Sequence, residues 1–193
     1  MERADSTALL RAARAGSPEA LDRLYRQVAG RLHALIRLRM GATLRARVES
    51  RDILQATLLR SFDRIDQFEG ETGGTLMAWL ARIAEHEIHD RADYERRGRR
   101  DAAREVTLES TAAPAVSTER SPLSLAILNE EALRLERAID RLDAAHREVI
   151  LLRKFEELSF REIAARMGRS EDACRMLLAR ALAALTLEVQ REP

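Results

Sequence analysis

Residues 158–185 read LSFREIAARMGRSEDACRMLLARALAAL, and this stretch decides the fold of the C-terminal part of the chain. Ser159 and Glu162 have the spacing of a capping box, so a helix is expected to begin there. Gly168 allows a tight turn, and Ser170 can cap the next helix. Two short helices joined by a glycine-containing turn are typical of the helix-turn-helix, whose second helix enters the major groove of DNA. An ordinary helical hairpin is the alternative.

Arginines surround this second helix, where guanidinium groups could reach phosphates or guanine edges. Arg175 is the strongest candidate for a base contact, and Glu171 could accept a hydrogen bond from a cytosine amino group. Alternatively, Glu171 and Asp172 complement the helix dipole and Arg175 is solvated. The candidate DNA-binding residues of the segment are Arg161, Arg169, Ser170, Glu171, Arg175 and Arg180.

Upstream of this motif, apolar residues recur at helical spacing from about residue 129, and Asp143 can cap a further helix. Residues 129–193 are therefore predicted to form a four-helix unit that ends in the helix-turn-helix. Residues 105–128 are rich in Pro, Ser, Thr and Ala and are predicted to be a flexible linker. Such a linker predicts that the units on either side move independently.

Residues 1–104 are predicted to form a separate helical unit. Ser17 followed by Pro18 marks a helix start, and an apolar stripe then continues to about Gly41. Ser50 is expected to open the next helix, in which Leu54, Leu58, Ser61, Phe62 and Ile65 mark one face. A glycine-rich loop over residues 68–75 precedes a long helix that is apolar at first and then basic.

The composition agrees with an all-α protein of two small domains. The 193 residues are 46% hydrophobic, 34% charged and 4% aromatic, and strong helix formers dominate. The net charge is only +1, so a nucleic-acid site must come from local clustering of arginines. A single cysteine excludes an internal disulfide, and no run of 18 apolar residues occurs. These features predict a cytoplasmic protein without membrane insertion.

The chain resembles the extracytoplasmic-function (ECF) RNA polymerase sigma factors. AIDRLDAAHREVILLRKFEELSFREIAARMGRSEDA resembles their C-terminal domain, which reads the upstream promoter element. ESRDILQATLLRSFDRIDQFEGETGG, followed by LMAWLARIAEHEIHDRADYERRGRR, resembles the domain that binds core polymerase and opens promoter DNA. The resemblance implies a factor that directs core RNA polymerase to promoters, and many relatives are held inactive by an anti-sigma factor.

The resemblance also assigns residues in the N-terminal unit. Asp52, Gln55, Leu58 and Leu59 match the surface that faces the polymerase, and Asp52, Gln55 and Leu59 share one helix stripe. A solvated helix face is the alternative. Glu71 and Thr72 lie in the loop that would receive an unstacked base of the minus-ten element. By our alignment this loop is about two residues longer than in many relatives.

The strand-opening face would follow on the long helix. Its candidate residues are Trp79, Arg82, His86, Asp90, Arg91, Tyr94, Arg96 and Arg97. Trp79 is expected to be a core anchor rather than a base-stacking residue, and His86 stands where relatives commonly have Asn. A second basic stretch, residues 31–47, contains five arginines and no acid. This stretch could contact DNA phosphates or could simply be a charged surface.

Two other functional classes can be weighed against this one. His86, His89 and Asp90 could bind a metal in an enzyme, but the two histidines are three residues apart rather than four and no third ligand is evident. No phosphate loop or nucleophile elbow occurs, so no enzyme and no cofactor are expected. The second alternative is an ordinary helix-turn-helix regulator with an N-terminal sensor domain.

Overall fold

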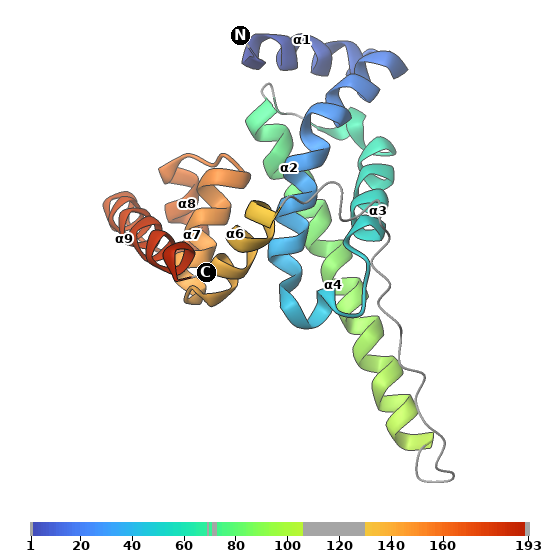
Figure 1. The fold of residues 1–193 in the computed structure, drawn as a ribbon. Coiled ribbons are helices and arrows are strands. Elements are labelled where there is room, and N and C mark those ends of the chain that lie inside the picture. Colours follow the sequence, from blue (N-terminus) through green and yellow to red (C-terminus); the bar gives the residue numbers. More distant parts are fainter. Residues whose placement is uncertain (1, 69, 71–72, 106–129, 192–193) are drawn as a thin grey trace.

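The computed structural model describes residues 2–68, 70, 73–105 and 130–191, and these are helical with no strand among them. Figure 1 shows two helical units. The first unit contains α1 (Glu2–Arg14), α2 (Pro18–Arg45), α3 (Ser50–Phe62), the 3₁₀ turn η1 (Ile65–Gln67) and α4 (Gly73–Glu105). The second unit contains α6 (Glu130–Arg141), α7 (Ala144–Ile150), the π turn η2 (Leu151–Phe155), α8 (Phe160–Met167) and α9 (Glu171–Gln190). The predicted linker lies almost entirely outside the described residues.

Helix α2 begins where the sequence predicts. The side chain of Ser17 accepts a hydrogen bond from the backbone N–H of Ala20, and Pro18 occupies the first turn. The helix continues past Gly41, where a left-handed φ of 66° kinks it, and ends at Arg45. Only glycine adopts this conformation without strain. The kink separates the apolar stripe before Gly41 from the last turn of the helix, which carries Arg45.

Helix α3 begins at Ser50, as the sequence predicts. Glu49 is the N-cap of α3, and Ser50 lies inside the first turn with its hydroxyl 2.8 Å from Nε2 of His33. Ser50 is buried, so this contact satisfies a polar group that would otherwise be costly to bury. Phe62 lies on the face of α3 that the sequence marks, and its side chain is 56% exposed.

The second unit has the predicted caps. Asp143 accepts from the backbone N–H of His146 at the start of α7. Ser159 and Glu162 form a reciprocal capping box at α8, and the side chain of Ser170 accepts from the N–H of Ala173 at α9. Gly168 has φ 63° and ψ 39°, the left-handed conformation that joins α8 to α9. The helix-turn-helix is therefore present.

Each unit has its own apolar core. In the first unit α2, α3 and α4 pack on each other around Leu24, Leu35 and Leu76, while the second unit encloses Val149 and Ile163. These side chains are at most 1% exposed, and burying one such side chain contributes about 1.5–3 kcal/mol. Cys174 belongs to the second core and is fully buried.

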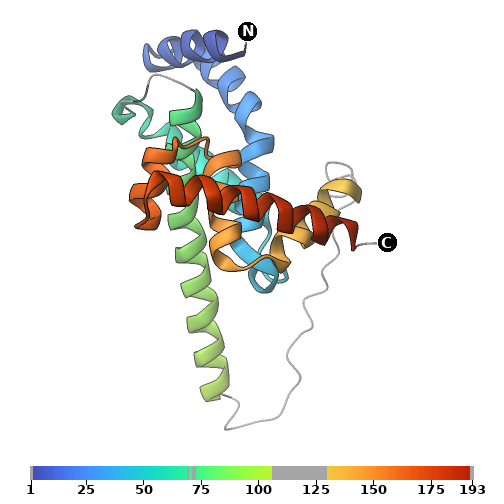
Figure 2. The ribbon, with the colours of Figure 1, turned by 90° about the vertical axis from the view of Figure 1, so that its left-hand side faces the viewer.

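The two units are in contact, although the linker composition predicts independent movement. Figures 1 and 2 show the second unit against α2 and α4. Ile139 of α6 and Leu151 of η2 are each 1% exposed and belong to the core cluster of the first unit. Within the described residues, no helix is long and apolar enough to cross a membrane.

Candidate functional site

The residues predicted to face the polymerase border one apolar groove. Gln55, Leu58 and Leu59 of α3 line a groove of about 650 Å³ between α2 and α3, and Asp52 is exposed one turn before Gln55. The remaining residues of the groove are Tyr25, Ala29, Gly30, His33, Arg51, Leu54 and Phe62. The structure therefore brings three of the four predicted residues together and leaves Asp52 at the edge.

Exposure of large apolar side chains distinguishes this groove from an ordinary surface. Leu59 is 61% exposed and Phe62 is 56% exposed, and both lie beside the partly buried Leu58. A contiguous apolar surface of this kind marks a binding site for another macromolecule. The sequence placed Leu54, Leu58 and Phe62 on one face of this helix, and in the structure all three line the groove.

Two buried hydrogen bonds support the groove from below. The hydroxyls of Tyr25 and Ser61 are 2.7 Å apart, and His33 contacts Ser50. Burial raises the pKa of Tyr25 above 10.0. Burial also lowers the pKa of His33 below 6.5, with a smaller contribution from neighbouring arginines, so its ring is neutral near pH 7. These contacts fix α2 against α3.

Residues predicted for strand opening meet at a second pocket. Trp79, Arg82, His86 and Asp90 line a pocket of about 260 Å³ together with Ile83, Arg60 and Arg64. Arg60 pairs with Glu87 at 2.5 Å, whereas Arg64 is exposed and has no ion pair within the described part of the chain. Sequence reasoning missed both arginines, of which Arg60 lies in the last turn of α3 and Arg64 in the turn that follows it.

Trp79 is a partly buried anchor of this pocket. Its ring lies 5.2 Å from the ring of buried Phe68 at an interplanar angle of 41°. Packing of this kind holds the start of α4 to the preceding loop. The expected anchoring role is therefore in agreement with the geometry, while one part of the indole remains accessible from the pocket.

The two histidines of α4 bond to their own helix. Nδ1 of His86 is 2.7 Å from the carbonyl oxygen of Arg82, and Nδ1 of His89 is 2.7 Å from that of Glu85. Each Nδ1–H therefore donates to the preceding turn, and both side chains are exposed. Among the described residues, no three His, Cys, Asp or Glu side chains are placed to hold a metal ion.

The remaining predicted residues of α4 lie beyond the pocket. Arg91 is 5.8 Å from the centre of the Tyr94 ring, and Tyr94 is 66% exposed. Arg96 pairs with Asp93, and Arg97 is exposed. An exposed aromatic ring beside cations is suited to stacking on an unpaired base. The predicted residues thus follow one helix but do not form one cavity.

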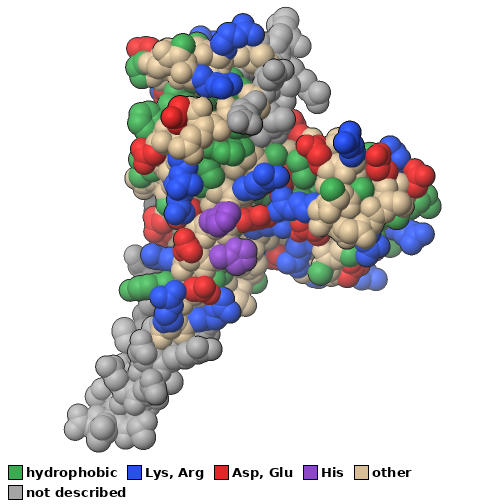
Figure 3. All heavy atoms as spheres, turned by 180° about the vertical axis from the view of Figure 1, so that it is seen from behind, with side chains coloured by type: hydrophobic (Ala, Val, Ile, Leu, Met, Phe, Trp, Pro, Cys, Tyr) green, Lys and Arg blue, Asp and Glu red, His purple; other side chains and the backbone are tan. Residues whose placement is uncertain are grey.

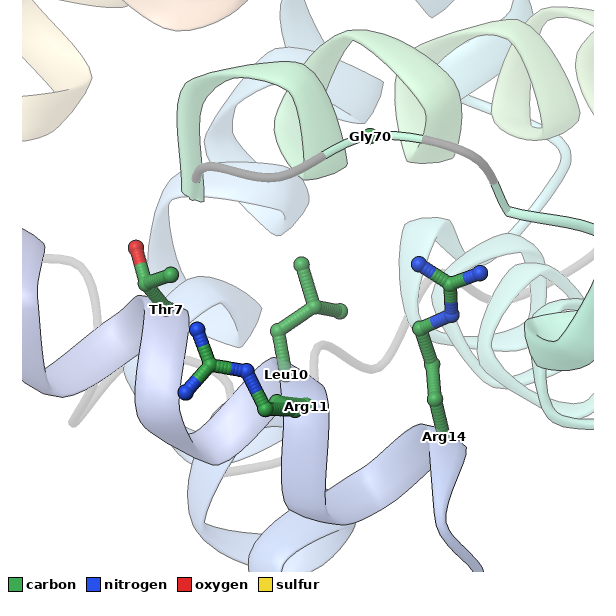
Figure 4. A pocket seen from close by; sticks show the side chains of 5 residues that line it. All are labelled: Thr7, Leu10, Arg11, Arg14 and Gly70. Atoms are coloured by element: carbon green, nitrogen blue, oxygen red, sulfur yellow. The ribbon is translucent and has the colours of Figure 1, made fainter.

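Glu71 and Thr72, which were predicted for the base-binding loop, lie outside the described residues. Gly70 of the same loop lines a pocket of about 310 Å³ with Thr7, Leu10, Arg11 and Arg14 of α1. Figure 4 shows Leu10 and Arg14 projecting from α1 toward the loop that carries Gly70. Sequence reasoning did not connect this N-terminal helix with the loop.

The helix-turn-helix presents an exposed polar surface. Arg161, Arg169, Ser170 and Glu171 are all exposed, as is Arg180 farther along α9. Ser170 accepts the backbone N–H of Ala173, so its side-chain oxygen is engaged in capping. Hydrogen bonds from Ser159 lower the pKa of Glu162, which keeps the capping box charged on its acidic side.

Arg175 has several partners within the protein. It donates to Asp172 at 2.8 Å and to Glu171 at 3.1 Å, and its guanidinium group lies 5.0 Å from the centre of the Phe160 ring. Arg153 lies 5.1 Å from the same ring. Arg175 is half exposed, and both of these acids lie on its own helix, where such pairs are weak.

The sequence left two roles for the arginines of residues 31–47, phosphate contact and a charged surface. In the structure most of them contact the second unit instead. Four of them, Arg31, Arg37, Arg39 and Arg45, form ion pairs with carboxylates of the second unit. Arg47 is exposed. Figure 3 shows the face turned away from the viewer in Figure 1, where basic and acidic side chains are interspersed. The basic stretch is therefore largely neutralised in this structure.

Comparison with known families gives two matches in the order of the two units. Sigma-70 region 2 matches residues 24–99, and Sigma-70, region 4 matches residues 132–185. Helix α1 lies before the first match.

Named relatives agree with these families. The ECF RNA polymerase sigma factor BldN of Streptomyces coelicolor is 31% identical over 180 residues, which cover 92% of this chain and 63% of the relative. The chain thus spans less than two thirds of that protein. The ECF RNA polymerase sigma factor SigD of Mycobacterium tuberculosis is 29% identical over 153 residues, covering 79% of this chain and 69% of the relative.

Solved structures share the fold. CnrH, in complex with the cytosolic domain of CnrY, has a TM-score of 0.55 at 22% identity, covering 98% of this chain and 99% of that one. RpoE, in complex with the anti-sigma factor NepR from Bartonella quintana, has a TM-score of 0.52 at 23% identity, covering 89% and 98%. At this level of identity the similarity concerns the fold alone.

Proposed function

Because the chain belongs to the ECF sigma factors, we propose that it binds core RNA polymerase, recognises promoter DNA and helps to open it. In this proposal residues 1–104 bind polymerase and melt DNA, residues 105–128 link the units, and residues 129–193 read the upstream element. The observation that carries the proposal is the apolar groove beside Gln55 and Leu59, in the same chain as a helix-turn-helix. Such a chain has both a protein-docking surface and a DNA-reading surface.

Docking would place an amphipathic helix of core polymerase in the groove between α2 and α3. Leu58, Leu59 and Phe62 would supply apolar contact, while Asp52 and Gln55 would fix the orientation through hydrogen bonds at the edge. The carboxylate of Asp52 repels DNA phosphate, which supports a protein partner at this surface. The same groove would also accept an amphipathic helix of an anti-sigma factor, which is therefore a second possible partner.

DNA opening would use the pocket on α3 and α4. Arg60, Arg64 and Arg82 would contact phosphates of the unpaired strand, while His86 and Asp90 would meet exposed base edges. His86 is exposed, and with its proton on Nδ1 its Nε2 can accept a hydrogen bond from a base, as the amide oxygen of Asn would. Tyr94 would offer its ring to a base farther along α4.

Recognition of the upstream element would use the N-terminal half of α9. Arg175 is placed for a guanine contact once it leaves Glu171 and Asp172, and Arg169 and Arg180 are exposed for phosphates. Such a factor works with polymerase in the cytoplasm and is not itself an enzyme. It positions the polymerase on promoter DNA, and the polymerase synthesises the RNA.

The experiment that tests the proposal separates a sigma factor from an ordinary regulator. The purified chain is titrated with core RNA polymerase and, separately, with promoter fragments. We expect submicromolar binding to core polymerase and weak binding to any fragment alone. A chain that ignores core polymerase but binds one DNA site tightly would be a regulator, and the proposal would fail.

A further inference from the structure

The two units meet across a charged surface that belongs mainly to α2. Arg37 donates to both carboxylate oxygens of Glu136, at 2.8 and 3.0 Å, and Arg45 contacts Glu136 and Asp140. Arg31 pairs with Glu157. The side chains of Arg37 and Arg45 are only 18% and 11% exposed, so their charges are substantially removed from solvent. These arginines require partners when buried in this way.

Glu156 lies at the centre of the interface. Its side chain is fully buried, with Arg39 of α2 at 2.7 Å and Arg166 of α8 at 3.1 Å. Arg166 also contacts Glu85 of α4 at 2.5 Å, and Arg39 contacts Glu148. The network therefore joins both units through α2, α4 and α8. Burial raises the pKa of Glu156, and the two guanidinium groups oppose this effect.

Apolar contact accompanies the ion pairs. Ile139 and Leu151 of the second unit are buried in the core cluster of the first, and Phe155 packs against it. Ala78 of α4 packs in turn against the core of the second unit. A buried apolar centre surrounded by paired charges is the anatomy of a specific interface. Arg31, Arg37, Arg39 and Arg45 of α2 each meet a carboxylate of the second unit, so the two surfaces are complementary in charge.

We propose that the arginine face of α2, formed by Arg31, Arg37, Arg39 and Arg45, is an internal docking surface that holds the free protein closed on its own second unit. This rests on the proposed function. A compact body of this size has a radius of gyration of about 16 Å. Promoter elements two DNA turns apart are separated by about 70 Å. The closed protein cannot read both, so polymerase binding must separate the units.

The closed state has a cost that the experiment can measure. If polymerase binds only the open form, the apparent affinity is reduced by the fraction of molecules that are open. Weakening the interface should therefore tighten apparent binding to polymerase. If these arginines contacted promoter phosphate instead, reversing their charge would weaken initiation. The two roles therefore predict opposite effects.

The test uses the full chain with dyes at two introduced cysteines, Gln67→Cys in η1 and Ala179→Cys in α9. Both positions are exposed, while the native Cys174 is fully buried. The opening variant is Arg37→Glu with Arg45→Glu, and its matched control is Arg23→Glu with Arg26→Glu, which changes two exposed charges on α2. We expect high energy transfer in the parent and control and a clear fall in the opening variant.

Rescue keeps the test independent of misfolding. Adding Glu136→Arg and Asp140→Arg to the opening variant should restore energy transfer, and circular dichroism should show unchanged helix content in all variants. A folded opening variant with unchanged transfer would overturn the proposal, as would a folded fourfold variant that stays open.

Core polymerase separates this inference from the proposed function. We expect polymerase to lower energy transfer in the parent and to bind the opening variant about 3- to 10-fold more tightly. Loss of transfer in the variant without any polymerase binding would uphold the internal docking surface and reject the sigma-factor function. Polymerase binding with energy transfer unchanged would reject the closed-state proposal alone.

Discussion

Arg39 of α2 donates a hydrogen bond of 2.7 Å to the fully buried carboxylate of Glu156, 117 residues farther along the chain. The pair crosses from one helical unit to the other. Favourable contacts with Glu148 and Glu156 raise the pKa of Arg39, so its charge is retained despite burial. The relationship explains why a strongly basic segment can occur in a chain whose net charge is only +1.

Polymerase docking predicts a specific loss of affinity. Asp52→Ala with Gln55→Ala should weaken binding to core polymerase about 5- to 30-fold, or about 1–2 kcal/mol, because two polar contacts at the groove edge are lost. The control is Asp22→Ala with Gln27→Ala, which removes the same side-chain types from the exposed face of α2. Equal affinities for the two variants would place the docking surface elsewhere.

Arg64 should contact the unpaired strand. Arg64→Ala should weaken binding of the polymerase complex to a DNA fork with a single-stranded minus-ten region, and it should reduce the salt dependence by about one phosphate contact. Arg23→Ala is the control, since Arg23 is exposed on α2 away from this pocket. An unchanged salt slope would remove Arg64 from the DNA-binding face.

Reading of the upstream element is predicted to depend on Arg175. Arg175→Ala should lower initiation and relax preference at one upstream base pair, a loss of about 1–3 kcal/mol of discrimination, with core binding unchanged. Arg191→Ala, at the far end of α9, serves as the control. An equal loss on every upstream sequence would make Arg175 a phosphate contact, and no loss would exclude it from the site.

His33 predicts a dependence of stability on pH. Its pKa is lowered in the folded protein, so the unfolded chain takes up a proton more readily. Its contribution to the free energy of unfolding is complete above about pH 6.5 and is lost as the pH falls toward the folded pKa, at most about 1.4 kcal/mol per pH unit. Urea unfolding between pH 7.5 and 5.5 should show this slope, and His33→Gln should flatten it. A parent slope that survives the substitution would assign the effect to another group.

The local features of the second unit could be predicted because they depend on residues close in sequence. Capping by Asp143, the box of Ser159 and Glu162, and the left-handed turn at Gly168 each involve contacts within three or four residues. The chemistry of such caps is read directly from residue type and spacing. The same holds for the stripe that places Gln55 beside Leu59.

The features that the sequence did not indicate have a different physical origin. The contact between the Ser50 hydroxyl and His33, and the exposure of Phe62, depend on how α2 packs against α3. The partners of Arg37 and Arg45 are 99 and 95 residues away, so spacing along the chain gives no sign of them. Contacts of this range arise from packing of one unit on the other.

RNA start sites should depend on this chain if it is a sigma factor. Genomic fragments of the source bacterium are transcribed by core RNA polymerase with and without this chain, and the RNA 5′ ends are sequenced. We expect discrete new start sites that require both proteins, share two upstream elements about two DNA turns apart, and weaken with Asp52→Ala and Gln55→Ala. Identical start sites with and without the chain would contradict the proposed function.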